Sequence, residues 1–231
     1  VTGEVLKTGP ITFSHIGILE WSRRQYHDSY PRSDLYDTVM ISTTSTADSL
    51  QERILSNTLR VDFAAGRTDR FRIGAGGGIR SELRTFGLVM PGDTLTRPDT
   101  VRYNRNSLVL TGKVFNNIGS KFGWNASGDL WFQGYRAGDF IVDGRIYKEF
   151  ETRKIGNIIW DATGTIASYT PSFWYYTWGS NNFLWQLDHK REFRLMAGSS
   201  LQWPEFKFSL RFNYAIVDNF IRMGTGAIPA Q

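Results

Sequence analysis

The chain has 231 residues, of which 41% are hydrophobic and 15% aromatic, with 23 Gly, 7 Pro and no Cys. This aromatic content excludes a disordered chain, and the absence of Cys excludes a disulfide scaffold and a thiolate metal site. The net charge of +5 arises from 27 Lys and Arg against 22 Asp and Glu. Because the basic residues form no cluster, we expect no nucleic-acid partner. No run approaches about 18 consecutive apolar residues, so no transmembrane helix is expected.

Apolar and polar residues alternate along most of the chain, as in β-strands with two different faces. In Phe206–Ile216 every even-numbered residue is apolar, whereas Lys207, Ser209, Arg211 and Asn213 share the other face. The two faces of the first strand are ambiguous. The pattern predicts no helix and about ten strands, which in chain order are Ile11–Tyr26, Arg53–Ala65, Arg70–Arg84, Ser107–Asn116, Phe122–Tyr135, Asp139–Phe150, Ile158–Ile166, Asn182–Asp188, Phe193–Trp203 and Phe206–Ile216.

The connections between these strands differ in length. Three long connections follow the first, third and seventh strands, so they are expected at one end of the sheet: Asp28–Leu50, Phe86–Tyr103 and Tyr169–Asn181. Short turns serve the other end: Gly66–Thr68, Asn117–Gly119 and Asp188–Glu192. Two further short turns, Arg136–Gly138 and Pro204–Glu205, are expected at the end that carries the long connections.

Such alternation fits either a soluble sandwich with its apolar face inward or a membrane barrel with that face toward lipid. The predicted strands are about 10 to 16 residues long, whereas sandwich strands are usually about 5 or 6 and a lipid-crossing strand needs about 9 to 11. Charged residues lie in the middle of the polar faces, and the long connections share one end. We therefore predict an all-β fold, a transmembrane antiparallel up-and-down β-barrel forming one outer-membrane domain over residues 1–231.

Aromatic residues gather near two strand ends. Trp and Tyr accumulate at membrane interfaces, where a partly polar ring suits the boundary between lipid and water. The alternative is an aromatic cluster packed beneath a loop. The residues expected at the membrane interface are Tyr169, Trp174, Tyr175, Tyr176, Trp178 and Trp203.

Three runs of sequence also carry a family resemblance: PSFWYYTWGSNNFLWQLDHKREFRLMAGSSLQWPEFKFSLRFNYAIVDNFI from Pro171, GPITFSHIGILEW from Gly9 and DSLQERILSNTLRVDF from Asp48. Their ordered aromatic, Asn and Pro residues resemble the Bacteroidetes "putative porin" family of outer-membrane barrels. Family members look like longer chains with a signal peptide and further strands. The resemblance therefore implies that this sequence is an internal piece of a larger barrel, and it supplies no catalytic residues.

Residues that would support catalysis or metal binding form no convincing pattern. The histidines His15, His27 and His189 have no HxH or HExxH partner, and a lipid-facing Ser–His dyad at His15 needs only a chance spacing. The run Gly74–Gly78 lacks the Lys-Ser/Thr of a phosphate loop, so we expect it to serve close strand packing. No calcium-loop spacing surrounds Asp48. We expect no enzyme, no metal and no cofactor.

The polar faces of the strands supply candidate pore-lining residues. A charged lining keeps water in a pore and influences which ions enter. The alternative is that these charges pair across strands and fill a closed lumen. The basic candidates are Arg60, Arg70, Arg72, Arg80, Arg84, Lys113, Arg145, Arg194, Lys207 and Arg211, and the acidic ones are Asp62, Glu82, Asp129, Asp143, Glu149, Asp161 and Asp188.

The function expected from the sequence is an outer-membrane porin that lets small hydrophilic solutes diffuse passively, with a weak preference for anions. Its partners would be outer-membrane lipid and those solutes, while the oligomeric state stays open. Two other functions remain open at this point. One is a non-conducting structural or assembly barrel that interacts through its loops. The other is a soluble β-sandwich that binds glycans through exposed aromatic residues.

Overall fold

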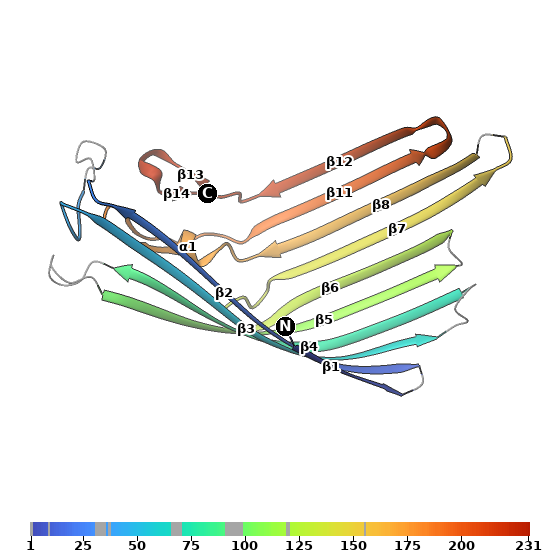
Figure 1. Cartoon of the computed structure of the whole chain (residues 1–231), viewed down its shortest axis with the longest axis horizontal. Coiled ribbons are helices and arrows are strands. Elements are labelled where there is room, and N and C mark those ends of the chain that lie inside the picture. The colour runs from blue at the N-terminus through green and yellow to red at the C-terminus, as the bar shows by residue number, and fades with distance from the viewer. Residues whose placement is uncertain are drawn as a thin grey trace.

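The computed structural model describes residues 2–8, 10–30, 36, 38–65, 71–90, 99–118, 121–154 and 156–231. For residues 2–8, 71–72, 99, 117–118 and 225 it describes the backbone alone. Ten strands pair in one antiparallel sheet in the order β1-β2-β3-β4-β5-β6-β7-β8-β11-β12 (Figure 1). Their bounds are β1 Thr2–Thr8, β2 Ile11–Asp28, β3 Thr46–Ala65, β4 Phe71–Met90, β5 Asp99–Ile118, β6 Phe122–Gly134, β7 Phe140–Thr152, β8 Gly156–Tyr169, β11 Glu192–Trp203 and β12 Phe208–Asp218.

Shorter elements lie outside this sheet. After β8 come α1 (Phe173–Tyr176), β9 (Thr177–Gly179) and β10 (Leu184–Gln186), and β9 and β10 pair as a hairpin of their own. The turn η1 (Pro204–Phe206) joins β11 to β12. The chain ends in β13 (Arg222–Met223), η2 (Thr225–Ala227) and β14 (Pro229–Ala230). Within the described ranges, no helix has the length and apolar character that crossing a membrane would require.

The predicted all-β, up-and-down arrangement is confirmed, but the expected strand Asn182–Asp188 is wrong. Its residues form β10 and coil outside the main sheet, because the alternation spans too few residues to cross it. The tenth place is taken by β1, which pairs with β2. Without that expected strand, the Pro204–Glu205 turn falls at the end that carries the short turns. The three long connections do share one end, as predicted (Figure 1).

Three strands are longer than the alternation alone predicts. β3, β4 and β5 each contain 20 residues, and the additional residues lie at the end that carries the long connections. At this end Leu50 pairs with Leu88 and Phe86 pairs with Tyr103. Here the polar face becomes apolar, because these side chains pack beneath α1. The sheet therefore continues well beyond the roughly 9 to 11 residues that cross a lipid layer.

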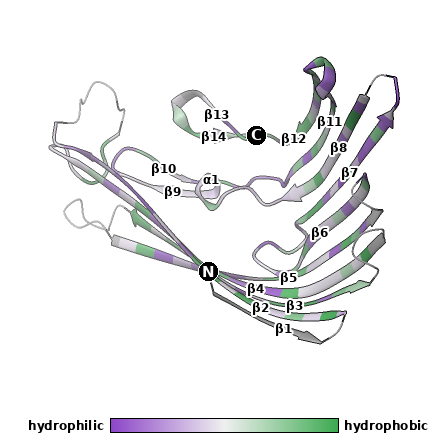
Figure 2. Ribbon diagram, turned by 45° about the vertical axis from the view of Figure 1, so that its right-hand side comes forward, coloured by the Kyte–Doolittle hydropathy of each residue, from purple (hydrophilic) through white to green (hydrophobic). Residues whose placement is uncertain are grey.

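The two faces of the sheet differ in chemistry. We call the face against which α1 packs the inner face, and the opposite one the outer face. In Figure 2 the sheet curves around α1, β9 and β10, and polar and apolar residues alternate along its strands. Large apolar residues occupy the outer face and remain exposed: Leu59 is 66% exposed, Ile79 54% and Leu110 51%. In the part of the chain that the structure describes, no second sheet covers this face, in contrast to a soluble sandwich.

The predicted alternation in the last long strand is confirmed from Phe208 onward. Phe208, Leu210, Phe212, Tyr214 and Ile216 are exposed and continue the outer-face rows of β11. As β12 is an edge strand, its other face is exposed as well.

The expectation that this strand starts at Phe206 is wrong, since Pro204 begins the 3-10 turn. Phe206 belongs to that turn, and Lys207 ends it with a left-handed φ of 51°.

The sheet is open. Among the described strands, β1 pairs only with β2 and β12 only with β11, so the two edges do not meet. This agrees with the expectation that the strands of this sequence do not close a barrel by themselves. The edge that β12 presents carries backbone N–H and C=O groups without a strand partner in the sheet.

Candidate functional site

The inner face carries a first ion cluster across β3, β4 and β5. The Arg60 Nε donates to both carboxylate oxygens of Asp62 at 2.9 Å, and the Lys113 Nζ lies 3.3 Å from the Asp62 Oδ1. The strand between them presents Gly76, where a Cβ atom would collide with the Asp62 carboxylate. The glycine run therefore serves close packing, as expected, by leaving room for an ion cluster to lie flat on β4.

A second, larger cluster lies further along the same strands. The Glu82 carboxylate is almost fully buried and accepts hydrogen bonds from the Arg80 Nε at 2.9 Å and from an Arg84 amino group at 3.4 Å. Arg80 also contacts Asp129 at 2.9 Å, and Arg84 contacts Glu52 at 3.5 Å. The two arginines are thus matched by three carboxylates. The sequence left charge pairing open as the alternative to a charged pore lining, and Arg80 and Arg84 are paired in this way.

Trp131 joins the second cluster to the neighbouring turn. Its indole is 3% exposed, and its Nε1 donates to the Glu82 Oε2 at 3.3 Å. The Arg136 guanidinium lies 4.0 Å from the centre of the ring, a cation–π contact. The ring therefore excludes water from one side of the Glu82 cluster, which strengthens its electrostatic interactions.

Other predicted lining residues on β7, β8 and β11 also have partners across the inner face. Arg145 contacts Asp161 at 2.6 Å. Thr165 donates to Asp143 at 2.6 Å, and Asn157 donates to Glu149 at 3.0 Å. Arg194 pairs with Glu192 and lies over the Tyr169 ring.

The remaining lining candidates are placed differently. Arg211 projects from the inner face of the edge strand β12, and Asp188 follows β10 outside the sheet. Lys207 lies in the turn before β12. Arg70 and the Arg72 side chain fall outside the described residues.

The long connection between β8 and β11, residues 170–191, folds back over the inner face, and we call it the inward segment (Figure 2). Its α1 places Phe173, 4% exposed, against Phe86 of β4 with the rings stacked at 4.3 Å. Tyr103 and Trp174 complete the contact at ring distances of 5.1 and 5.4 Å. An aromatic residue from the connection after β8 thus packs on β4 and β5, which lie four and three positions away from β8 in the sheet.

The base of the inward segment is held by Asp139, whose side chain is fully buried. Its Oδ1 accepts hydrogen bonds from the Thr170 N–H at 2.8 Å and from the Thr170 hydroxyl at 2.9 Å. Two cations also contact its carboxylate, Arg136 at 2.7 Å and Arg191 at 3.4 Å. Both ends of the segment are therefore tied to the turn between β6 and β7.

The tip of the inward segment is held by Asn181, which is 1% exposed. Its amide oxygen accepts from the backbone N–H groups of Ile41 and Ser42 at 3.0 and 2.8 Å. Its amide nitrogen donates to the Ser42 carbonyl and to the Thr46 hydroxyl, both at 2.9 Å. The Asn181 N–H donates to the Asp48 Oδ1 at 2.8 Å. One side chain thus satisfies four polar groups of the connection between β2 and β3.

Desolvation affects a phenol within the same segment. Burial, the largest cause, together with the nearby Tyr135, Asp188 and Asp139 raises the pKa of Tyr176 from 10.0 to about 12. Its hydroxyl donates to the His189 carbonyl at 3.1 Å, which fits a phenol that stays neutral.

The aromatic residues predicted at the membrane interface lie in two settings. Trp203 is on the outer face at the end of β11, where an interface role remains a prediction. Tyr169 is on the inner face, where it donates to Glu192 at 2.8 Å. Trp174, Tyr175, Tyr176 and Trp178 belong to α1 and β9 of the inward segment. These four residues correspond to the alternative that the sequence left open, an aromatic cluster packed with a loop.

The comparison with protein families matches residues 6–231 to the family described as "Putative porin". The chain belongs to this family. Searches of curated proteins and of solved structures matched nothing. Family membership covers nearly every strand of the sheet and agrees with the resemblance noted in the sequence.

Several residues of this porin-family chain that hold the site together were missed by sequence reasoning. Glu52 was overlooked because the alternation placed the start of β3 at Arg53. Asp139 lies just before β7 and Asn181 lies in a bend, so no period marks their contacts, and apart from Arg136 their side-chain partners are 31 to 140 positions away. For Asn181, the one feature of the sequence that could have indicated a structural role is its position among aromatic residues in the run WGSNNFLW.

Within the described part of the chain, two of the three histidines have ordinary hydrogen-bond partners. His27 contacts Ser29 at 3.2 Å and His189 contacts the Tyr175 carbonyl at 3.1 Å, while His15 lies on the outer face of β2. Among the described side chains, no three His, Asp or Glu residues converge as a metal site would require.

Proposed function

We propose that residues 1–231 act as one domain that forms part of the wall of an outer-membrane β-barrel, through which small hydrophilic solutes diffuse passively. The observation that carries this proposal is the contrast between the two faces of one continuous sheet. Leu59, Ile79 and Leu110 expose apolar side chains on the outer face, while the Arg80–Glu82–Arg84 cluster lies on the inner face. This is the polarity of a sheet between lipid and water.

In lipid, the open edges of this sheet need partners. Unpaired backbone groups within a hydrocarbon layer each cost several kcal/mol. We propose that further strands pair with β1 and β12 and complete the barrel, which is the arrangement that the porin family implies. The solute path is the space bounded by the inner face, and it is narrowed by the inward segment where that segment packs on β4.

Ion selectivity is expected to be weak. Arg80 and Arg84 are each paired with carboxylates, so their field is largely cancelled at a distance. Arg211 carries no ion pair among the described residues and can favour anions near the β12 edge. Any preference should decrease with rising salt, because charges are screened within about 8–10 Å at physiological ionic strength.

A non-conducting barrel is the second candidate, and one observation favours it: the inward segment is anchored at both its base and its tip. Planar-bilayer recordings of the full-length protein separate the two. A porin gives discrete conductance steps, whereas a plugged barrel inserts without current. A protein that remains monodisperse without detergent and does not insert would refute both.

A further inference from the structure

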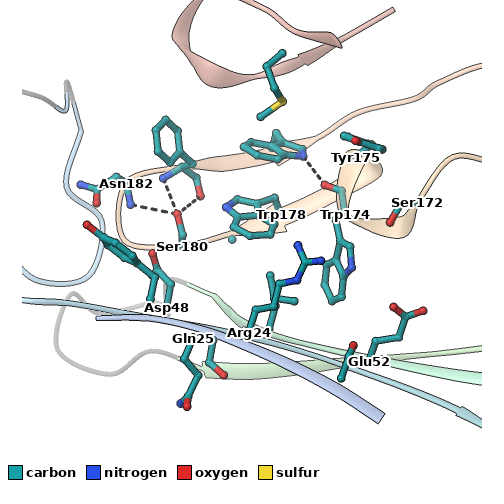
Figure 3. A pocket seen from close by; sticks show the side chains of 18 of the residues that line it. Arg24, Gln25, Asp48, Glu52, Ser172, Trp174, Tyr175, Trp178, Ser180 and Asn182 are labelled. Carbon is teal, nitrogen blue, oxygen red and sulfur yellow. Dashed lines mark hydrogen bonds between the residues drawn. The ribbon is translucent and has the colours of Figure 1, made fainter. Parts of the chain in front are cut away.

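The inward segment and the ends of β2 and β3 line an open-sided cavity of about 770 Å³. This is within the roughly 300–1,000 Å³ of typical small-molecule sites. One wall is aromatic and comes from the inward segment, with Trp174, Trp178 and Trp185. The opposite side is polar and comes from the strands, with Arg24 and Glu52 beneath the indoles (Figure 3).

The aromatic wall is fixed before any ligand arrives. Trp178 and Trp185 stack at 5.5 Å with an interplanar angle of 14°, and Trp174 meets Trp178 edge-on at 6.4 Å. The Trp185 Nε1 donates to the Trp174 carbonyl at 3.1 Å. All three indoles are half-buried and line the cavity. Rigid aromatic surface of this kind binds flat apolar faces with little loss of conformational entropy.

The polar side of the cavity offers one free charge. The Glu52 carboxylate is paired with Arg84 at 3.5 Å, and the Asp48 carboxylate accepts the Asn181 N–H at 2.8 Å. Arg24 is exposed, projects from β2 toward the indoles, and has no hydrogen bond or ion pair among the described residues (Figure 3). Its guanidinium keeps all five donors available, and it binds carboxylates in a bidentate manner.

The two sides together define the ligand. We propose that this cavity binds an acidic saccharide, a sugar unit that carries a carboxylate. The C–H face of the sugar ring lies on Trp174 or Trp178, its hydroxyls reach Ser172 and Asn182, and its carboxylate pairs with Arg24. A purely aromatic acid would leave the surrounding polar groups without partners, which costs about 1–3 kcal/mol for each group that it buries. This inference rests on the proposed function, because the cavity lies beside the proposed solute path.

The test measures tryptophan fluorescence of the full-length protein in detergent during titration with digalacturonate, with the neutral disaccharide cellobiose as comparison. We expect saturable quenching by digalacturonate and an apparent affinity for cellobiose at least about tenfold weaker. Arg24→Gln should lower the digalacturonate affinity about tenfold or more, the expected loss of a charge-assisted pair. Arg23→Gln is the matched control, because Arg23 is an exposed arginine one position away on the opposite face of β2.

Two results would overturn the inference: no saturable response to digalacturonate, or equal binding of both sugars that Arg24→Gln leaves unchanged. Conductance measured on the same preparation keeps this failure apart from that of the proposed function. Channels that conduct without a saccharide response refute only the saccharide site. Saturable, Arg24-dependent binding without conductance supports the site and refutes only the pore.

Discussion

Replacing Phe173 with Ala tests whether the inward segment narrows a solute path. Phe173 is 4% exposed and stacks on Phe86 at 4.3 Å, with Tyr103 and Trp174 closing the contact. Truncation of a buried Phe costs about 3–5 kcal/mol. That loss falls on the docking of the segment, because Phe173 is its one fully inserted aromatic side chain in the cluster with Phe86 and Leu88. A cost of about 3 kcal/mol raises the undocked fraction more than a hundredfold.

Single-channel conductance and limited proteolysis report on the two consequences of this change. We expect Phe173→Ala to increase the conductance and to make residues 170–191 more sensitive to protease. Leu184→Ala is the control, because Leu184 lies in the same segment but is 49% exposed. It should behave like the unchanged protein, as surface substitutions usually cost less than about 0.5 kcal/mol. Conductance that stays the same although proteolysis shows a released segment would refute the reasoning, as would equal behaviour of both variants.

Four further predictions follow from the same contacts. Asn181→Ala removes four side-chain hydrogen bonds and leaves the Ile41 and Ser42 N–H groups without their acceptor, so the tip of the inward segment should become sensitive to protease. Asn182→Ala loses one exposed bond to the Thr38 carbonyl and should leave protease sensitivity unchanged. Glu82→Gln removes the carboxylate between Arg80 and Arg84 and should destabilise the folded protein by about 3–5 kcal/mol in denaturant unfolding. Asp143→Asn should cost far less, because Asp143 is exposed and the Asn amide oxygen can still accept from the Thr165 hydroxyl. The pKa of Tyr176 is raised from 10.0 to about 12, so the neutral phenol should stabilise the docked inward segment fully below pH 10 and lose that contribution as the pH rises through about 12. The protease sensitivity of the segment should therefore increase over this pH window, and it should change less in Tyr176→Phe. Phe212→Arg on the outer face in the middle of β12 should cost about 2–4 kcal/mol in lipid vesicles, whereas Phe208→Arg should cost about 1 kcal/mol or less, because Phe208 begins β12 opposite Trp203 at the strand end; Arg211→Phe should also cost less.

Much of the sheet follows from the sequence because its physical cause is local. A strand with one apolar and one polar side must alternate, so β6, β7 and β11 have nearly the bounds that the period predicts. The additional residues of β3, β4 and β5 could not be predicted this way. Their inner face becomes apolar at Leu50, Phe86 and Leu88 because α1 packs there, and the period offers no sign of that contact.

The site follows less well from the sequence, since its contacts join distant segments. The lining charges could be assigned to a face, yet their pairing depends on register: Glu82 meets Arg80 and Arg84 on its own strand, while Asp129 reaches Arg80 and Glu52 reaches Arg84 from two other strands. The tryptophans of α1 and β9 were expected at an interface because Trp and Tyr favour that boundary. Whether such rings turn toward lipid or toward the inner face depends on how the 22-residue connection folds. In this chain the hydrogen bonds of Asp139 and Asn181 hold that connection over the inner face.

The central claim, that the outer face contacts lipid and the inner face contacts water, can be tested directly because the chain contains no Cys. Single Cys residues would be introduced along β7 in the reconstituted full-length protein, at the outer positions Val142 and Ile146 and at the inner positions Asp143 and Arg145, all four of which are exposed in the sheet itself. Each would then be treated with a membrane-impermeant thiol reagent. The account predicts a period of two, with rapid labelling at Asp143 and Arg145 and protection at Val142 and Ile146. Equal labelling at all four positions, or protection of the inner pair alone, would contradict it.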